Sequence, residues 1–233
     1  MLSEKQRISP KADSPSLTNR VYHTIFQEII TGKIPGETML VAATLAQQLG
    51  VSITPVRESL LRLANEGLVK PIPRVGYIVE AMSEAEVIDL FEARIGIERL
   101  AASLAVEKVT PAEVDFLQNN LQRMNEVIQQ GRTEEMIGLD TSFHQFIAQA
   151  TRNRTLFSVS QLIIQRTYRF RYACIRIMEI AQSTRDQHSE IVKAFREKNP
   201  QKVDSAMLAH LGGVKSQIFA YLGQLRLDSL GPL

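Results

Sequence analysis

The sequence predicts a mainly α-helical fold, in which a small part with a β-hairpin precedes an antiparallel bundle of about six helices. Three observations support this prediction. Apolar residues recur at helical spacing from Leu17 onward. Two β-prone segments flank a proline and glycine turn within residues 69–79. From Ser83 to the end, helix-capping signals follow one another with almost no strand pattern.

The composition indicates a globular protein. The chain has 233 residues, of which 44% are hydrophobic, so it can bury a core in one large domain or two small ones. Cys174 is the only cysteine, which excludes an internal disulfide framework and a cysteine-based zinc module. A net charge of +2 does not by itself indicate a nucleic-acid partner. Neither a secretory signal nor a membrane span is apparent, so we expect a cytoplasmic protein with no membrane partner.

The first part of the chain contains the signals of three helices and a hairpin. Residues 1–15 mix charged residues, serine and proline without periodicity, and we expect a flexible leader there. Helices are expected from Leu17 to before Gly32, over 42–49, and from Ser52 to about Asn65. His23, in the first of them, is expected to be structural.

This order predicts a winged helix-turn-helix domain over residues 16–80, with the hairpin as the wing. The third helix has an apolar face, while its outer face would enter the major groove of double-stranded DNA. Ser52 and Thr54 suit phosphate contacts, and Arg57 can reach a guanine edge or a phosphate. Arg74, at the hairpin tip, could reach a minor groove or the backbone. The alternative is a small α/β module in which Arg57 is a solvated surface residue.

Residues 83–226 are expected to form an all-helical domain. Ser83 with Glu86, and Thr110 with Glu113, are capping boxes. Six helices are expected at about 83–108, 110–131, 134–150, 153–180, 183–198 and from 200 onward. The run of arginines within residues 166–176 is interleaved with aromatic residues, and we expect it to be solvated or to lie between subunits.

Three of the four histidines lie in this helical domain, on three different expected helices. His144 is one turn after Asp140, and His188 and His210 follow on later helices. Facing helices of a bundle can bring such side chains to one point, where they would bind a divalent ion: zinc, nickel, manganese or iron. An octahedral ion would keep two positions for water or a ligand carboxylate. The alternative is that each histidine is an ordinary core or surface residue.

The N-terminal motifs strongly resemble the winged-helix domain of the GntR family of bacterial transcription regulators. The runs that carry this resemblance are Gly32-Lys33-Ile34-Pro35-Gly36-Glu37, Leu45-Ala46, Leu49-Gly50-Val51-Ser52, Thr54-Pro55-Val56-Arg57-Glu58 and Glu66-Gly67-Leu68-Val69. Ile53 stands where the family usually has an arginine, and the usual acidic residue before Leu45 is absent. A base-contacting guanidinium is therefore missing, which implies a different operator preference or a lower affinity.

Residues 84–225 resemble the effector-binding (FCD) domain of the FadR-like subgroup of that family. The matching runs are Leu90-Phe91-Glu92-Ala93-Arg94 with Glu98, Phe143-His144 with Asp140, His188 with Ile191, and Met207 with His210-Leu211. In metal-containing members one Asp and three His hold the ion, which implies the same role for the four residues here. The resemblance also implies that Arg94 binds a carboxylate effector; alternatively, Arg94 pairs with Glu98 or Glu92.

Together these features predict a ligand-responsive transcription regulator, a repressor in most such proteins, and not an enzyme. It would bind a palindromic operator as a homodimer and sense a small organic acid at the metal site. The alternatives are a metal-dependent enzyme, a sensor of the metal itself, and a bundle that binds acyl chains without metal.

Overall fold

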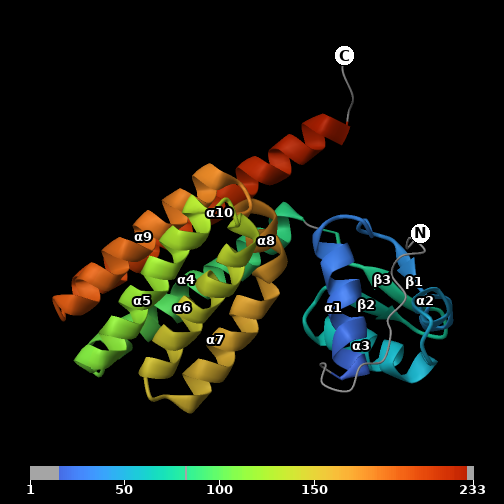
Figure 1. The fold of residues 1–233 in the computed structure, drawn as a ribbon, viewed down its shortest axis with the longest axis horizontal. Coiled ribbons are helices and arrows are strands. Elements are labelled where there is room, and N and C mark those ends of the chain that lie inside the picture. The colour runs from blue at the N-terminus through green and yellow to red at the C-terminus, as the bar shows by residue number, and fades with distance from the viewer. Residues whose placement is uncertain (1–15, 82, 230–233) are drawn as a thin grey trace. The chain divides into compact units, whose positions relative to one another are not determined.

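The chain divides into two compact units, Met1–Met82 and Ser83–Leu233, in a computed structural model that describes residues 16–81 and 83–229 (Figure 1). The expected leader over residues 1–15 lies outside the described residues. The predicted fold class is confirmed, since helices dominate both units and a single small sheet lies in the first, within the part that the structure describes.

The first unit contains three helices and a three-stranded antiparallel sheet. The helices are α1 (Leu17–Ile30), α2 (Ala42–Leu49) and α3 (Ile53–Asn65). The strands are β1 (Met39–Leu40), β2 (Val69–Ile72) and β3 (Gly76–Val79), in the order β1-β3-β2. The hairpin of β2 and β3 is the one that the sequence predicts, whereas the short strand β1 was not expected.

Packing between α1 and α3 forms the core of this unit, where Val21, Leu60 and Leu63 are fully buried. A polar network fixes the same contact. The hydroxyl of Tyr22 donates to Oε2 of Glu66 at 2.6 Å, and Arg62 Nε donates to the other oxygen at 3.0 Å. The guanidinium of Arg62 also lies 3.7 Å above the ring of Tyr22. Because the carboxylate is buried and paired twice, α3 is held firmly against α1.

Two glycines are required by the backbone of the first unit. Gly50 ends α2 in the left-handed conformation (φ 68°) and makes the turn into α3. Gly76 has φ 155°, and a Cβ there would lie 2.4 Å from the carbonyl oxygen of Leu40. Only a glycine therefore lets β3 approach β1 at this point.

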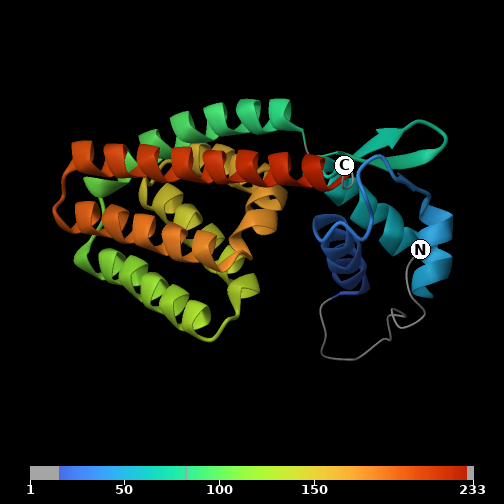
Figure 2. The same ribbon diagram turned by 90° about the horizontal axis from the view of Figure 1, so that it is seen from above.

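The second unit is a bundle of helices. They are α4 (Glu84–Val106), α5 (Pro111–Gln129), α6 (Met136–Ala150), α7 (Arg154–Arg166), α8 (Tyr168–Ile175), α9 (Met178–Arg196) and α10 (Pro200–Ser229). Figure 2 shows α10 between α4 and α9, with α5 on the far side of α9. The expected capping box of Thr110 and Glu113 is formed at the start of α5, whereas at the start of α4 Ser83 caps the helix by accepting from the Glu86 N–H. Among the described residues, no helix is long and apolar enough to cross a membrane.

The expected long helix over residues 153–180 is wrong, because the chain breaks there into α7, α8 and the start of α9. Thr167 closes α7, and its hydroxyl donates to the carbonyl oxygens of Ile163 and Ile164. Apolar residues continue across this break, so periodicity alone does not reveal it. The next helix consequently begins at Met178 rather than at Ser183 or Thr184, and Thr184 is buried inside it.

Candidate metal centre and nucleic-acid interface

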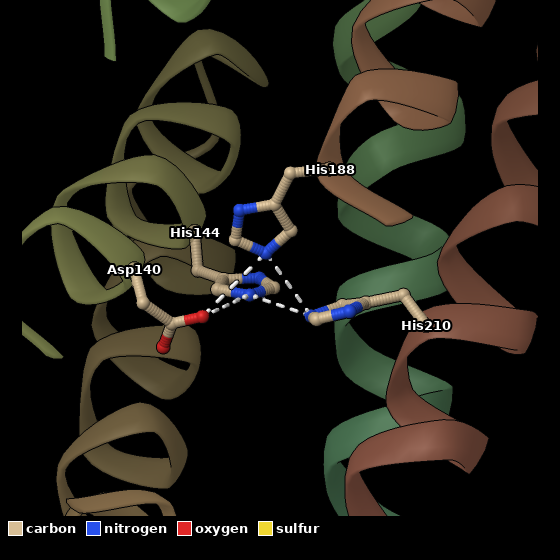
Figure 3. Close-up of side chains that lie close together, drawn as sticks. All are labelled: Asp140, His144, His188 and His210. Atoms are coloured by element: carbon tan, nitrogen blue, oxygen red, sulfur yellow. Dashed lines mark hydrogen bonds and ion pairs between the residues drawn. The ribbon is translucent and has the colours of Figure 1, made fainter. Parts of the chain in front are cut away.

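Four side chains with metal-ligating atoms converge in the core of the helical unit (Figure 3). Asp140 and His144 lie one turn apart on α6, His188 lies on α9, and His210 lies on α10. None is more than 2% exposed. One donor atom from each lies within 4.8 Å of the others, so the structure brings together all four residues that the sequence singled out.

The separations between these donor atoms match those around a single ion. Nε2 of His210 lies 3.1 Å from Nε2 of His144 and 3.2 Å from Nε2 of His188. Oδ1 of Asp140 lies 3.6 Å from Nε2 of His144 and 3.5 Å from Nε2 of His188. Neighbouring ligands with bonds of about 2.0–2.2 Å are separated by roughly 2.8–3.6 Å, depending on the angle at the ion. These four separations therefore suit neighbouring ligands of one divalent ion.

The outer nitrogens of two imidazoles show that their lone pairs face this common point. Nδ1 of His144 lies 2.5 Å from a carboxylate oxygen of Glu98, and Nδ1 of His210 lies 2.9 Å from the amide oxygen of Gln187. An oxygen beside a ring nitrogen favours the tautomer in which that nitrogen carries the hydrogen. In the neutral rings Nε2 is then the lone-pair atom. Two such atoms 3.1 Å apart repel one another unless a cation or a proton lies between them.

The charge states of three of these four groups also suit metal binding, whereas burial would lower the pKa of the fourth, His144, but the Glu98 carboxylate raises it. Burial would raise the pKa of Asp140, but the charge of the Arg171 guanidinium holds it well below the usual range. Burial lowers the pKa of His188 to about 3, and burial with the two neighbouring imidazoles lowers that of His210 as well. These groups are therefore an anionic carboxylate and two neutral imidazoles, which are the forms that bind metals.

Two of the arginines within residues 166–176 are buried inside the unit. The expectation that they are solvated or lie between subunits is therefore wrong for these two. Arg169 and Arg171, on α8, are each 3% exposed. Arg169 pairs with Glu86 at the start of α4, and Arg171 pairs with Oδ2 of Asp140. Arg171 also donates to the carbonyl oxygen of Ile164 at 2.8 Å. The break between α7 and α8 determines these orientations, and no signal in the sequence indicated it.

Arg94 on α4 is fully buried and lies next to this cluster. Its Nε is 2.5 Å from Oε1 of Glu98, as in the alternative considered from the sequence. Within the described part of the chain, neither terminal nitrogen of Arg94 has a hydrogen-bond partner. Burial would raise the pKa of Glu98, but Arg94 and His144 together lower it to about 2. Glu98 is thus an anion between a cation and a candidate metal ligand, a place that the sequence did not reveal.

The first unit presents its candidate DNA-binding residues on the surface. Val56, Leu60 and Leu63 of α3 face the core, whereas Ser52, Thr54 and Arg57 are exposed at the start of the helix. Arg74 is exposed in the turn of the hairpin, with φ 65°. His23 is also exposed, with its ring edge-on to that of Tyr22.

Comparisons with protein families match both units. Residues 17–79 match the family described as bacterial regulatory proteins, gntR family, and residues 89–213 match the FCD domain. The candidate DNA-binding residues lie within the first match, and the four candidate metal ligands lie within the second.

Relatives of known name are transcription regulators. A regulator from an unstable DNA locus of Streptomyces ambofaciens is 30% identical over 89% of this chain and 88% of its own length. The transcriptional repressor RspR of Escherichia coli is 24% identical over 87% of this chain and 89% of its length. The regulator McbR of E. coli is 31% identical, but that match covers 55% of this chain and 58% of McbR. The solved structure of E. coli McbR has the same fold, with a TM-score of 0.71 at 23% identity over 91% of this chain and all of that one.

Proposed function

The chain belongs to the GntR family of bacterial transcription regulators and has an FCD domain, and we propose that it is a ligand-responsive repressor. As a member of this family it binds DNA and is a regulator rather than an enzyme. The specific operator, effector and metal are our proposals.

The buried cluster of one carboxylate and three imidazoles is the observation that supports a regulatory metal centre. Oδ1 of Asp140 and Nε2 of His144, His188 and His210 would hold a divalent ion. Zinc, nickel, manganese and iron all accept such a ligand set. When bound, the ion would offer a Lewis-acidic position to an oxygen ligand.

Arg94 supports a small organic acid as the effector. Its two buried terminal nitrogens offer the fork of donors that a carboxylate accepts, and a guanidinium keeps its charge in the core. An effector would thus bind between the ion and Arg94. Its binding would change the affinity for the operator only to the extent that the effector binds one arrangement of the protein more tightly than another.

On the DNA side, Arg57 would contact bases or phosphates, Ser52 and Thr54 would contact phosphates, and Arg74 would contact the backbone or minor groove. Two copies of α3 in a homodimer would match a palindromic operator. Ile53 occupies the position of a base-contacting arginine, so this operator would differ from that of arginine-containing relatives.

The experiment that tests the proposal measures metal, effector and operator on the same full-length protein. We expect about one divalent ion per chain by elemental analysis after loading with Zn²⁺ or Ni²⁺. A panel of mono-, di- and tricarboxylic acids should contain compounds that raise the melting temperature of the loaded protein. Arg94→Met should abolish this rise. Arg99→Met, which changes another arginine of α4, one that pairs with Asp204 on α10, should not.

DNA selected from a random pool should contain a two-fold symmetric site, and the stabilising acids should weaken binding to it. A protein that holds no ion after loading would refute the metal centre. Selected sites without symmetry would refute the dimeric operator complex, and operator affinity that no stabilising acid changes would refute ligand control.

A further inference from the structure

Glu98 lies near the middle of α4 with each of its carboxylate oxygens against a different buried group. Oε1 is 2.5 Å from Nε of Arg94, and Oε2 is 2.5 Å from Nδ1 of His144. The residue is 3% exposed, so bulk solvent does not screen either contact. Glu98 therefore joins the proposed effector-binding arginine to a proposed metal ligand.

The three imidazoles differ in what holds their outer nitrogen. Nδ1 of His144 lies 2.5 Å from the Glu98 carboxylate, an ion-pair contact that lacks hydrogen-bond geometry, and Nδ1 of His210 faces the neutral amide of Gln187. Nδ1 of His188 has neither contact nor hydrogen bond among the described residues. A carboxylate on the outer nitrogen keeps the hydrogen there, fixes the ring, and makes the inner nitrogen a stronger donor to a metal. Only His144 has such an anionic partner among these three.

We propose that Glu98 is a positioning residue of the metal centre, holding His144 with Nε2 toward the other ligands while it also fixes Arg94. The proposal rests on the proposed function, because it concerns the same centre. It predicts that the charge of Glu98 contributes to metal affinity although the residue touches no ion. It also explains why Arg94 keeps both terminal nitrogens for another partner, since Glu98 engages only Nε.

The same helix supplies a matched control. Glu86 also lies on α4 and also pairs with a buried arginine, Arg169, whereas Glu98 pairs with Arg94 and with the proposed ligand His144. Glu86→Gln and Glu98→Gln therefore each remove one negative charge from α4 and leave one buried arginine short of its carboxylate. A merely structural role for Glu98 predicts similar effects of the two substitutions on metal affinity.

The test titrates Zn²⁺ into chelator-stripped, full-length protein against a chromophoric competitor. We expect Glu98→Gln to weaken Zn²⁺ binding by roughly 10- to 100-fold, the usual loss when a partner behind a ligand is removed. Glu86→Gln should stay within about threefold of wild type by the same reasoning. The Zn²⁺ affinity of Glu98→Asp, which has a shorter carboxylate, should lie between those of the two glutamine variants. This variant replaces Glu98→Gln in the test if the latter does not fold.

A second readout is the tautomer of His144, observed in two-bond ¹⁵N–¹H correlation spectra. Wild type should show the hydrogen on Nδ1, and Glu98→Gln should show a smaller fraction of that form. Wild-type affinity and an unchanged tautomer in a folded Glu98 variant would overturn the inference while leaving the metal centre intact. If wild type itself binds no Zn²⁺, the proposed metal centre fails and this inference fails with it.

Discussion

The two units present their candidate functional residues in opposite environments. In the first unit Ser52, Thr54, Arg57 and Arg74 are exposed. In the second unit all four proposed ligands are buried, and the charged groups around them are paired. Exposed residues that act on a partner do so nearly independently, whereas buried charges depend on their neighbours. The first site should therefore tolerate single changes without loss of fold, and the second should respond to them collectively.

The largest expected effect is on the buried site. His144→Ala removes a ligand and the partner of Glu98, so bound metal should fall from about one ion per chain to near zero, a loss of affinity of at least ~100-fold. Elemental analysis and the metal-dependent rise in melting temperature measure this. His23→Ala, which removes an exposed histidine of the first unit, is the control. Full metal content in the His144 variant would contradict the assignment of this ligand.

Arg57→Ala tests whether the exposed site is separable from the fold. Operator affinity should fall by about 10- to 100-fold, since a bidentate base contact contributes about 1–3 kcal/mol. Helical content and metal content should stay as in wild type, because Arg57 is exposed on α3. Fluorescence anisotropy with the selected operator measures the affinity, and Arg176→Ala, at an exposed arginine paired with Glu134, is the control. An unchanged titration would remove Arg57 from the interface.

Tyr22→Phe tests the buried network of the first unit. The change removes the hydroxyl that donates to Glu66 and should lower the free energy of unfolding of this unit by about 1–2 kcal/mol. Urea unfolding followed by circular dichroism measures this loss. Metal affinity should not change, since the residue lies in the other unit. A matching loss of metal binding would show that the units are not independent.

Acidification should lower the stability of the second unit, and this is the smallest of the expected effects. The lowered pKa values of His188 and His210 mean that the unfolded chain takes up protons below pH 6.5 while the folded unit does not. Stability without metal is therefore expected to decrease as the pH falls through this range, by a net amount of about 1 kcal/mol near pH 5.5 once the opposing effect of His144 is included. The raised pKa of His144 opposes part of this change. Urea titrations at several pH values after chelation measure it, and a rise in stability on acidification would contradict it.

Much of the fold follows from local signals in the sequence. Ser83 with Glu86 and Thr110 with Glu113 mark the starts of α4 and α5, because a cap needs only residues within one turn. Gly32, Gly50 and Gly67 mark the ends of the first three helices, and all have positive φ. The break at Thr167 has no comparable signal, since Arg171, which donates to the carbonyl of Ile164, is turned inward by its pairing with Asp140 on another helix.

The sequence by itself determined which residue types could form a site: an aspartate and a histidine one helical turn apart with two histidines on later helices, and a helix with an arginine on its outer face. Its local signals extend over only a turn or two. Only the tertiary structure decided that four donors from three helices come within 4.8 Å, that Arg171 turns inward, and that Glu98 lies between Arg94 and His144. The physical reason is that distances between helix faces depend on how side chains from distant segments pack together.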